Sequence, residues 1–263
     1  MNASRFAQIS SPWLPTQPSA EARLRVFCFP YAGGGPAVFR EWGTYFEGTG
    51  LQLCPISCPG REKRIKEVPL ESMKLLADGA FEAMLPYLAK PFALLGLCFG
   101  ANLAFETALR CRDAGFVPEG MLISGNRAPH LPSQDNIASM SDEKFLGHLR
   151  CLGFIPQIIF DTPDLLELFL PTLRADFLVD ASYVYNGTMT PFTFPLALFV
   201  GKHDSSTPEL SVHAWRAYTT GPFVSREFEG DHLFFALYRD AYLESIKKEL
   251  LAMIAPLSVT QLS

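Results

Sequence analysis

Residues 92–105 read Phe-Ala-Leu-Leu-Gly-Leu-Cys-Phe-Gly-Ala-Asn-Leu-Ala-Phe, and the rest of the chain is best interpreted from this stretch. Its first four residues are apolar, which is typical of a buried strand. The tight turn Gly96-Leu97-Cys98-Phe99-Gly100 follows, and residues from 101 onward have helical composition. The stretch therefore predicts a strand, a sharp turn and a helix, with Cys98 at the centre of the turn.

The two glycines explain the spacing of this turn. A sharp strand-to-helix turn strains its central residue, and small residues two positions away let the two backbones approach. The Cys98 side chain then stands at a helix N-terminus, where free N–H groups and the helix dipole favour negative charge. This is the nucleophile elbow of the α/β-hydrolase fold, with cysteine in the usual place of serine. The alternative is a buried structural cysteine between two packing glycines.

Composition limits the class of protein. The 263 residues suit one large α/β domain, and 48% apolar with 19% charged residues supply a core without a sign of disorder. The net charge of −5 argues against a nucleic-acid partner. Apolar runs fall short of the roughly 20 residues that span a membrane, and the polar N-terminus lacks a signal peptide. We expect a cytoplasmic protein that does not associate with membranes.

The cysteines do not form a recognisable framework. None of their spacings is a zinc-type spacing backed by histidines, and the chain is too long for a small disulfide scaffold. We therefore predict reduced thiols and no metal site. The six are Cys28, Cys54, Cys58, Cys98, Cys111 and Cys151.

Strands and helices alternate along most of the chain. This order predicts a mostly parallel sheet with helices on both faces, built from residues 23–263 after a loose lead-in of residues 1–22. The expected strands are 24–30, 51–57, 92–95, 120–124, 195–201 and 224–228. The expected helices are 37–46, 70–88, 101–114 and 240–254.

Residues 130–191 interrupt this alternation. They contain helical segments at 142–152 and 163–185, and an apolar stretch at 154–160, without a clear sheet strand. Because active-site loops emerge where strands of such sheets end, we interpret the region as an inserted helical lid over an acyl pocket. The alternative is helical padding on the domain.

A cysteine nucleophile needs a base and a group that orients the base. His232 lies in the loop between the last strand and the last helix, where the chain order nucleophile, acid, histidine places the base. Asp204 directly follows the strand 195–201, so its carboxylate is expected at the same edge. The rival acids are Asp176, Asp180 and Asp231. The remaining histidines, which we expect to be exposed or locally bonded, are His130, His148, His203 and His213.

An oxyanion hole requires backbone N–H groups beside the nucleophile. We expect one from Phe99 and one from the loop after the first strand, at Tyr31 or Ala32. The glycines at 33–35 allow that loop to curl beside the elbow. A dinucleotide site is the alternative for a glycine-rich loop, but G-x-G-x-x-G is absent and no acidic residue ends the following strand.

Several motifs can be taken together: 29–34 (Phe-Pro-Tyr-Ala-Gly-Gly), 59–62 (Pro-Gly-Arg-Glu), the elbow, 127–129 (Arg-Ala-Pro), 173–177 (Leu-Arg-Ala-Asp-Phe) and 230–235 (Gly-Asp-His-Leu-Phe-Phe). Together they resemble one family. The chain looks like a stand-alone, type II thioesterase of polyketide and non-ribosomal peptide pathways over roughly residues 22–254. The resemblance implies an α/β-hydrolase domain with a mobile lid, and hydrolysis of acyl groups from phosphopantetheine thiols of carrier proteins. It implies no cofactor of its own, and it places the triad on Cys98, Asp204 and His232.

The nucleophile departs from the family pattern, which is normally Gly-His-Ser-Met-Gly. With Cys98 the acyl-enzyme is a thioester instead of an oxyester, so a second thiol or an amine can capture the acyl group. An acyl or aminoacyl transferase is therefore the second hypothesis, and a non-catalytic protein that binds carriers is the third. The sequence does not distinguish a natural Cys98 from an engineered one.

Carrier proteins are generally acidic, so a partner with net charge −5 needs a local basic surface. The densest basic cluster is at residues 61–66, and we predict docking by Arg61, Lys63 and Arg64. The alternative is a solvated loop with Arg61 tied to a nearby carboxylate. We expect the protein to act as a monomer with acyl or peptidyl carrier proteins as partners.

Overall fold

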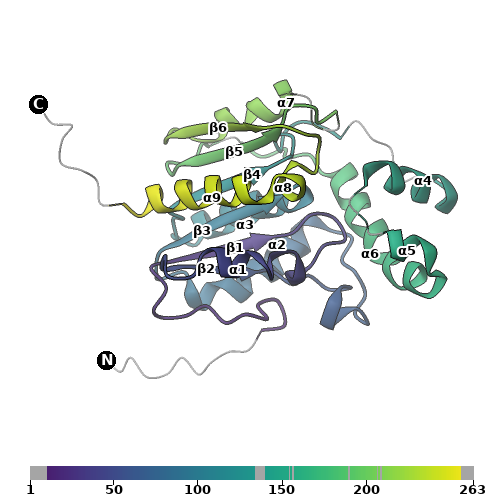
Figure 1. Ribbon diagram of the computed structural model, residues 1–263. Coiled ribbons are helices and arrows are strands. Elements are labelled where there is room, and N and C mark those ends of the chain that lie inside the picture. The colour runs from purple at the N-terminus through teal and green to yellow at the C-terminus, as the bar shows by residue number, and fades with distance from the viewer. Residues whose placement is uncertain are drawn as a thin grey trace, which may run out of the picture.

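The computed structural model describes residues 11–133, 140–153, 155, 157–188, 190–205, 207 and 209–255 (Figure 1). In this part of the chain, six parallel strands form one sheet in the order β2-β1-β3-β4-β5-β6. The predicted mostly parallel sheet is confirmed. The strands are β1 (Leu24–Phe29), β2 (Leu51–Pro55), β3 (Phe92–Leu97), β4 (Gly120–Ser124), β5 (Leu196–Gly201) and β6 (Phe223–Phe228).

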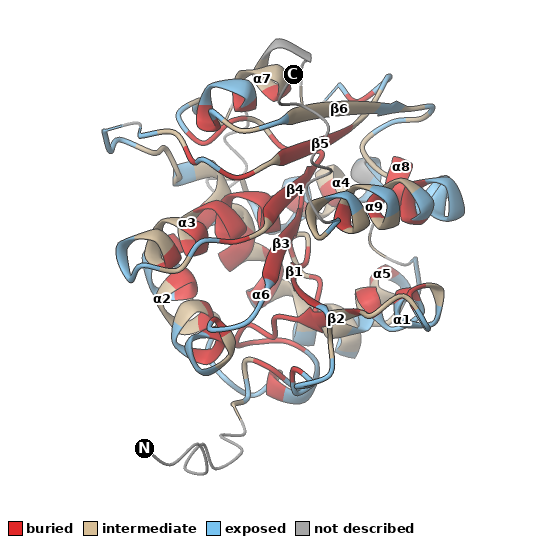
Figure 2. Cartoon of the chain, turned by 90° about the vertical axis from the view of Figure 1, so that its left-hand side faces the viewer, coloured by how far each residue is buried: buried red, intermediate tan, exposed pale blue. Residues whose placement is uncertain are grey.

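Helices cover both faces of this sheet. Helices α2 and α3 lie on one face, and α1, α8 and α9 lie on the other (Figure 2). The α-helices are α1 (Trp42–Tyr45), α2 (Met73–Met84), α3 (Phe99–Asp113), α4 (Asp142–Leu152), α5 (Gln157–Asp161), α6 (Pro163–Ser182), α7 (Glu209–His213), α8 (Phe234–Leu237) and α9 (Arg239–Met253). Short 3-10 turns are η1 (Pro36–Phe39), η2 (Glu62–Arg64), η3 (Leu85–Tyr87) and η5 (Ala214–Tyr218).

The strand register explains why the central strands are apolar throughout. Residues paired side by side in a parallel sheet point to the same face, and the next row points to the other. Both rows are buried, each in its own hydrophobic cluster, so the strands have no polar face. One row is Phe27, Leu94, Met121 and Leu196, and the next is Cys28, Leu95, Leu122 and Ala197.

The described part of the lead-in, residues 11–22, is not loose. Leu14 is buried, and the Trp13 carbonyl accepts a hydrogen bond from the Ser57 N–H. The Arg64 guanidinium lies 4.9 Å from the centroid of the Trp13 ring, and that ring fills the space beside Gly79 of α2. An aromatic side chain seated on the body fixes this segment, which its polar composition did not indicate. Residues 1–10 lie outside the described residues.

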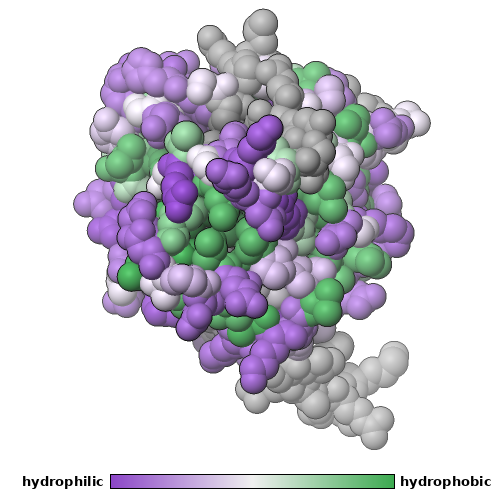
Figure 3. Space-filling model, turned by 90° about the vertical axis from the view of Figure 1, so that its right-hand side faces the viewer, coloured by the Kyte–Doolittle hydropathy of each residue, from purple (hydrophilic) through white to green (hydrophobic). Residues whose placement is uncertain are grey.

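The insertion between β4 and β5 consists of α4, α5 and α6, to one side of the sheet in Figure 1. It has a small hydrophobic cluster of its own, formed by Phe145, Leu149, Phe160 and Leu173. The face of the molecule on this side carries a central patch of apolar surface bordered by polar side chains (Figure 3). Ile158 of α5 and Leu168 of α6 are exposed apolar residues of this insertion.

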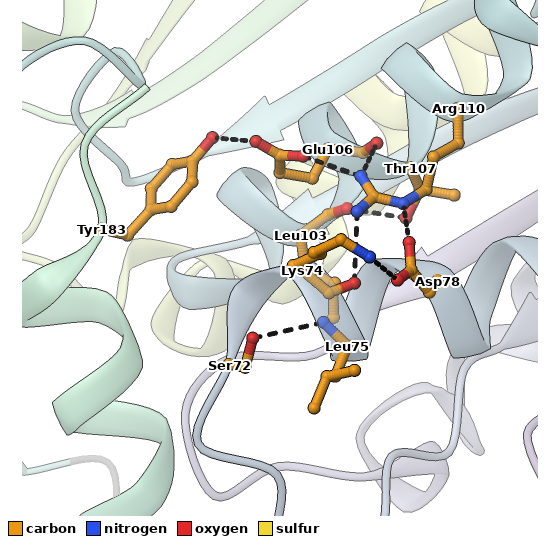
Figure 4. A network of polar contacts seen from close by, with 9 residues as sticks. All are labelled: Ser72, Lys74, Leu75, Asp78, Leu103, Glu106, Thr107, Arg110 and Tyr183. Atoms are coloured by element: carbon orange, nitrogen blue, oxygen red, sulfur yellow. Dashed lines mark hydrogen bonds and ion pairs between the residues drawn. The ribbon is translucent and has the colours of Figure 1, made fainter. Parts of the chain in front are cut away.

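A polar network ties the end of α6 to the helices beneath it (Figure 4). The Tyr183 hydroxyl donates to Glu106 of α3 over 2.7 Å, and Glu106 pairs with Arg110 over 2.7 Å. Arg110 in turn pairs with Asp78 of α2 over 2.6 Å, and Asp78 binds Lys74. The insertion thus returns to the domain at a point that is fixed by several partners.

Among the described residues, no helix combines the length and apolar character that crossing a membrane requires.

Candidate active site

The turn at Cys98 has the strained geometry that its sequence predicts. Cys98 is the N-cap of α3 and has φ 49° and ψ −122°, a conformation that a side-chain-bearing residue rarely adopts. A Cβ on Gly96 would lie 2.5 Å from the Ala101 Cα, and one on Gly100 would lie 2.2 Å from the Phe29 carbonyl oxygen. Both glycines are therefore required, because helix α3 starts directly against β3 and the end of β1.

Cys98 differs from most of the other cysteines in its surroundings. It is partly exposed, whereas four thiols are buried in the two main cores and only Cys151 on α4 is exposed. Burial raises the pKa of Cys54 to about 12 and the pKa of Cys58 to about 11, so these thiols stay protonated and inert at neutral pH. The described residues contain no cluster of His, Cys, Asp or Glu side chains suited to a metal ion.

His232 and Asp204 meet at the carboxyl edge of the sheet. Asp204 follows β5 and His232 follows β6, and the His232 Nδ1 lies 2.8 Å from the Asp204 Oδ2. The Asp204 side chain is 2% exposed, and Thr207 donates to it through both its backbone N–H and its hydroxyl. This carboxylate is therefore held in place from two sides, and it orients the imidazole.

The electrostatics of His232 involve Cys98 directly. Burial alone lowers the pKa of His232, but the charge of Cys98 and hydrogen bonds with Asp204 and Cys98 raise it well above the ordinary range. The raised pKa therefore favours the protonated imidazole beside the Cys98 sulfur.

The rival acids have other partners. Asp176 binds Arg61, Asp180 binds Arg127, and the Asp231 carboxylate accepts the Leu233 N–H over 2.9 Å. None of these bonds leads to His232. Among the other histidines, His130 Nδ1 is 2.9 Å from the Tyr218 hydroxyl, and His203 is exposed beside Glu229.

The loop after β1 lies beside the elbow, as the oxyanion-hole prediction requires. The Phe29 and Pro30 carbonyls border Gly100, and the Tyr31 ring stacks on Phe235 with centroids 5.9 Å apart. Phe99 is the first residue of α3, where N–H groups have no carbonyl one turn earlier to bond. The assignment of the donors to Phe99 and to Tyr31 or Ala32 stays a prediction.

Asn126 is a residue of the site that sequence reasoning missed. Its side-chain amide donates to the Cys98 carbonyl over 2.8 Å, and its own carbonyl accepts the Trp215 indole N–H. The preceding Gly125 has φ 58°, and a Cβ there would lie 3.5 Å from the His232 ring. The available signal was position, because both residues directly follow β4, the strand next to the elbow strand.

Two of the three residues of the predicted docking cluster, Arg61 and Arg64, are buried and have partners inside the protein. Arg61 is 2% exposed and forms a bidentate pair with Asp176, and Arg64 is 8% exposed and binds Glu67 and the Ser57 carbonyl. Their guanidinium groups are not on the open surface that docking was predicted to use, and carrier docking by the cluster stays a prediction. Lys63 is exposed, so one residue of the predicted cluster is left for docking.

The fold and the site together define a class. A mostly parallel sheet, a strained turn between strand and helix, an aspartate after β5 and a histidine after β6 are the features of an α/β-hydrolase. A family model described as a thioesterase domain matches residues 24–250. The chain belongs to this thioesterase family.

Similar proteins cover nearly the whole chain. Gramicidin S biosynthesis protein GrsT of Aneurinibacillus migulanus is 36% identical over 255 residues, which are 95% of this chain and 98% of that protein. The structure of the RedJ thioesterase from the prodiginine pathway of Streptomyces coelicolor superposes with a TM-score of 0.83 at 32% identity, covering 94% of this chain and 98% of RedJ. YbtT, a type II thioesterase from the yersiniabactin pathway, has a TM-score of 0.78 at 29% identity, covering 91% and 97%.

Proposed function

We propose that this protein is a stand-alone thioesterase that hydrolyses acyl or aminoacyl thioesters on the phosphopantetheine arm of carrier proteins. Cys98 is the nucleophile, His232 transfers protons and Asp204 orients His232. The observation that carries the proposal is the 2.8 Å bond from His232 to Asp204 behind a strained, partly exposed Cys98. Relatives named for gramicidin S and yersiniabactin biosynthesis support carrier proteins of a synthase or synthetase as partners.

Acylation begins at the Cys98 sulfur, whose proton passes to the neighbouring His232. The Cys98 thiolate attacks the thioester carbonyl, the carbonyl electrons move to oxygen, and backbone N–H groups of Phe99 and of Tyr31 or Ala32 stabilise that oxyanion. When the intermediate collapses, the bond to the phosphopantetheine sulfur breaks. His232 gives its proton to the departing thiolate, and the acyl group remains on Cys98.

Hydrolysis then regenerates the enzyme. His232 is now neutral, because it has lost its proton and no longer faces a charged sulfur, so it can take a proton from water. The hydroxide attacks the acyl carbon, the bond to the Cys98 sulfur breaks, and a free acid leaves. The Cys98 sulfur leaves as a thiolate and takes back the proton that His232 holds.

The experiment that tests this proposal uses a carrier protein loaded with a radiolabelled acyl group. Release of labelled acid by the wild type, and its loss in Cys98→Ala with the fold intact, is the expected result. Unchanged turnover in Cys98→Ala would remove Cys98 as the nucleophile. Label that accumulates on Cys98 and moves to a second carrier would show a transferase, and binding without transfer of label would show a carrier-binding protein.

A further inference from the structure

Two motifs without a catalytic role meet in the interior of the protein. Arg61, from the segment after β2, and Asp176, from α6, are 115 residues apart in the chain. The guanidinium donates two parallel hydrogen bonds of 2.9 Å to the two carboxylate oxygens. The side chains are 2% and 0% exposed, so the pair is shielded from solvent. Such a bidentate buried pair fixes position and direction together.

The third partner of this pair is the loop after β1. The Asp176 Oδ2 also accepts the Gly33 N–H over 2.7 Å, and Arg61 donates to the Gly34 carbonyl over 3.0 Å. Gly33 has φ 75°, and a Cβ there would lie 2.4 Å from the Leu173 side chain of α6. Arg61 and Asp176 thus hold the loop by its backbone, on both a donor and an acceptor.

These bonds fix the backbone next to the predicted oxyanion donors. The Gly33 N–H belongs to Asp176, and the Gly34 N–H donates to the Tyr31 carbonyl over 2.9 Å. Pro30 has no N–H. Tyr31 and Ala32, the predicted oxyanion donors, directly precede these two anchored glycines. Their direction depends on the two residues that Arg61 and Asp176 immobilise.

We propose that Arg61 and Asp176 are positioning residues for the oxyanion hole, and that through them helix α6 sets the direction of the oxyanion donor. This inference rests on the proposed function, since it assumes that Cys98 attacks a thioester carbonyl. Small displacements of a donor matter in such a site because stabilisation of the oxyanion depends on donors already in place.

The test compares two reactions of the same sulfur. Acylation of Cys98 by an acyl thioester of N-acetylcysteamine creates an oxyanion, whereas alkylation of Cys98 by iodoacetamide does not. The variant is Asp176→Asn, which replaces one carboxylate oxygen with an NH2 group facing the Arg61 donors. We expect acylation to slow roughly 10- to 100-fold and alkylation to stay within about twofold of the wild type.

Asp180→Asn is the matched control. Asp180 lies one turn further along α6 and pairs with Arg127 over 2.9 Å, without a bond to the loop after β1. Both rates should stay within about twofold in this variant. If Asp180→Asn slows acylation as much as Asp176→Asn does, or if Asp176→Asn slows both reactions equally or neither, the positioning role is wrong.

A second variant covers the case in which Asp176→Asn fails to fold. The double replacement Arg61→Met with Asp176→Leu removes both buried charges together, which proteins often tolerate. The same pair of rates decides, with thermal unfolding as the check of the fold. Failure of the proposed function is distinguishable, because the wild type would then form no acyl adduct on Cys98 at all.

Discussion

The two halves of helix α6, before and after Pro171, differ in their burial and in the parts of the protein that they contact. Its buried residues, Thr172, Leu173, Ala175, Asp176 and Val179, all follow Pro171, and none precedes it. After Pro171 the helix binds the body through Gly60, Arg61, Arg127 and Asn102. Before Pro171, residues 163–170 are exposed or half-buried and pack with α4 and α5.

This difference bears on which part of the insertion is expected to move. A proline inside a helix lacks the N–H that bonds one turn back, and it weakens the helix at that position. We therefore interpret the predicted lid, residues 130–191, as two units that meet at Pro171. We expect the segment before Pro171 to move as the lid, and the segment after it to belong to the catalytic body.

The largest effect should come from breaking the anchored half. Asp176→Ala leaves Arg61 buried without its partner, which costs about 3–5 kcal/mol of the free energy of unfolding. Asp142→Ala removes a carboxylate that joins α4 to Arg174 at the surface, and should cost no more than about 1 kcal/mol. Denaturant unfolding measures both. Equal costs would show that the buried pair of α6 stabilises the protein no more than a surface contact does.

His232 follows β6 in the body of the domain, so the pH dependence of its protonation should not depend on the position of the insertion. The pKa of His232 is raised above its value near 6.5 in the unfolded chain. The stability it contributes is therefore fully present below pH 6.5 and is lost as pH rises through the raised folded pKa.

Cys98→Ala should lower the pKa of His232, since it removes the charge and the hydrogen bond of the sulfur. NMR titration of the imidazole measures this shift. The decline in stability with rising pH should also be shallower than in the wild type. An unchanged pKa would mean that Asp204 alone determines the protonation of His232.

Pro171→Ala should make helix α6 more rigid where its two halves meet. The new N–H can donate one turn back in α6, and one net hydrogen bond of about 1 kcal/mol slows local opening roughly five- to tenfold. Hydrogen exchange at residues 163–170 is the measurement, with residues 172–182 as the internal control. Faster exchange before Pro171 in the variant would show that the proline does not divide the helix.

The smallest effect is expected at Lys63, which lies in η2 next to the anchored Arg61. Lys63→Glu should slow the reaction with an acylated carrier protein less than about threefold, and only at low salt, since one surface charge acts mainly on encounter. Hydrolysis of a small acyl thioester should not change. A loss that persists at high salt would point to a direct contact with the carrier.

The sequence predicted what depends on local pattern. The six apolar runs are six strands of the sheet. The glycines on either side of Cys98 predicted a tight turn, and the close backbone contacts there explain why glycine is needed. His232 and Asp204 were found through the order of strand ends, and their 2.8 Å separation agrees with that order. Their catalytic roles remain predictions.

What the sequence could not show depends on contacts between distant segments. Arg61 looked like part of a basic surface and Asp176 like a rival acid, because neither pattern indicates a partner 115 residues away. Asn126 carried no motif of its own. Helix 163–185 was expected as one element, and only the burial of its second half reveals the division at Pro171.

The distribution of cysteines has a practical consequence for watching this protein at work. Four thiols are sealed in the cores, Cys98 is part of the proposed reaction, and Cys151 sits exposed on α4, in the segment expected to move. A fluorophore on Cys151 would therefore report lid movement, while the acyl group on Cys98 protects that sulfur from the dye. A single labelling reaction at Cys151 would then follow the insertion without a newly introduced cysteine.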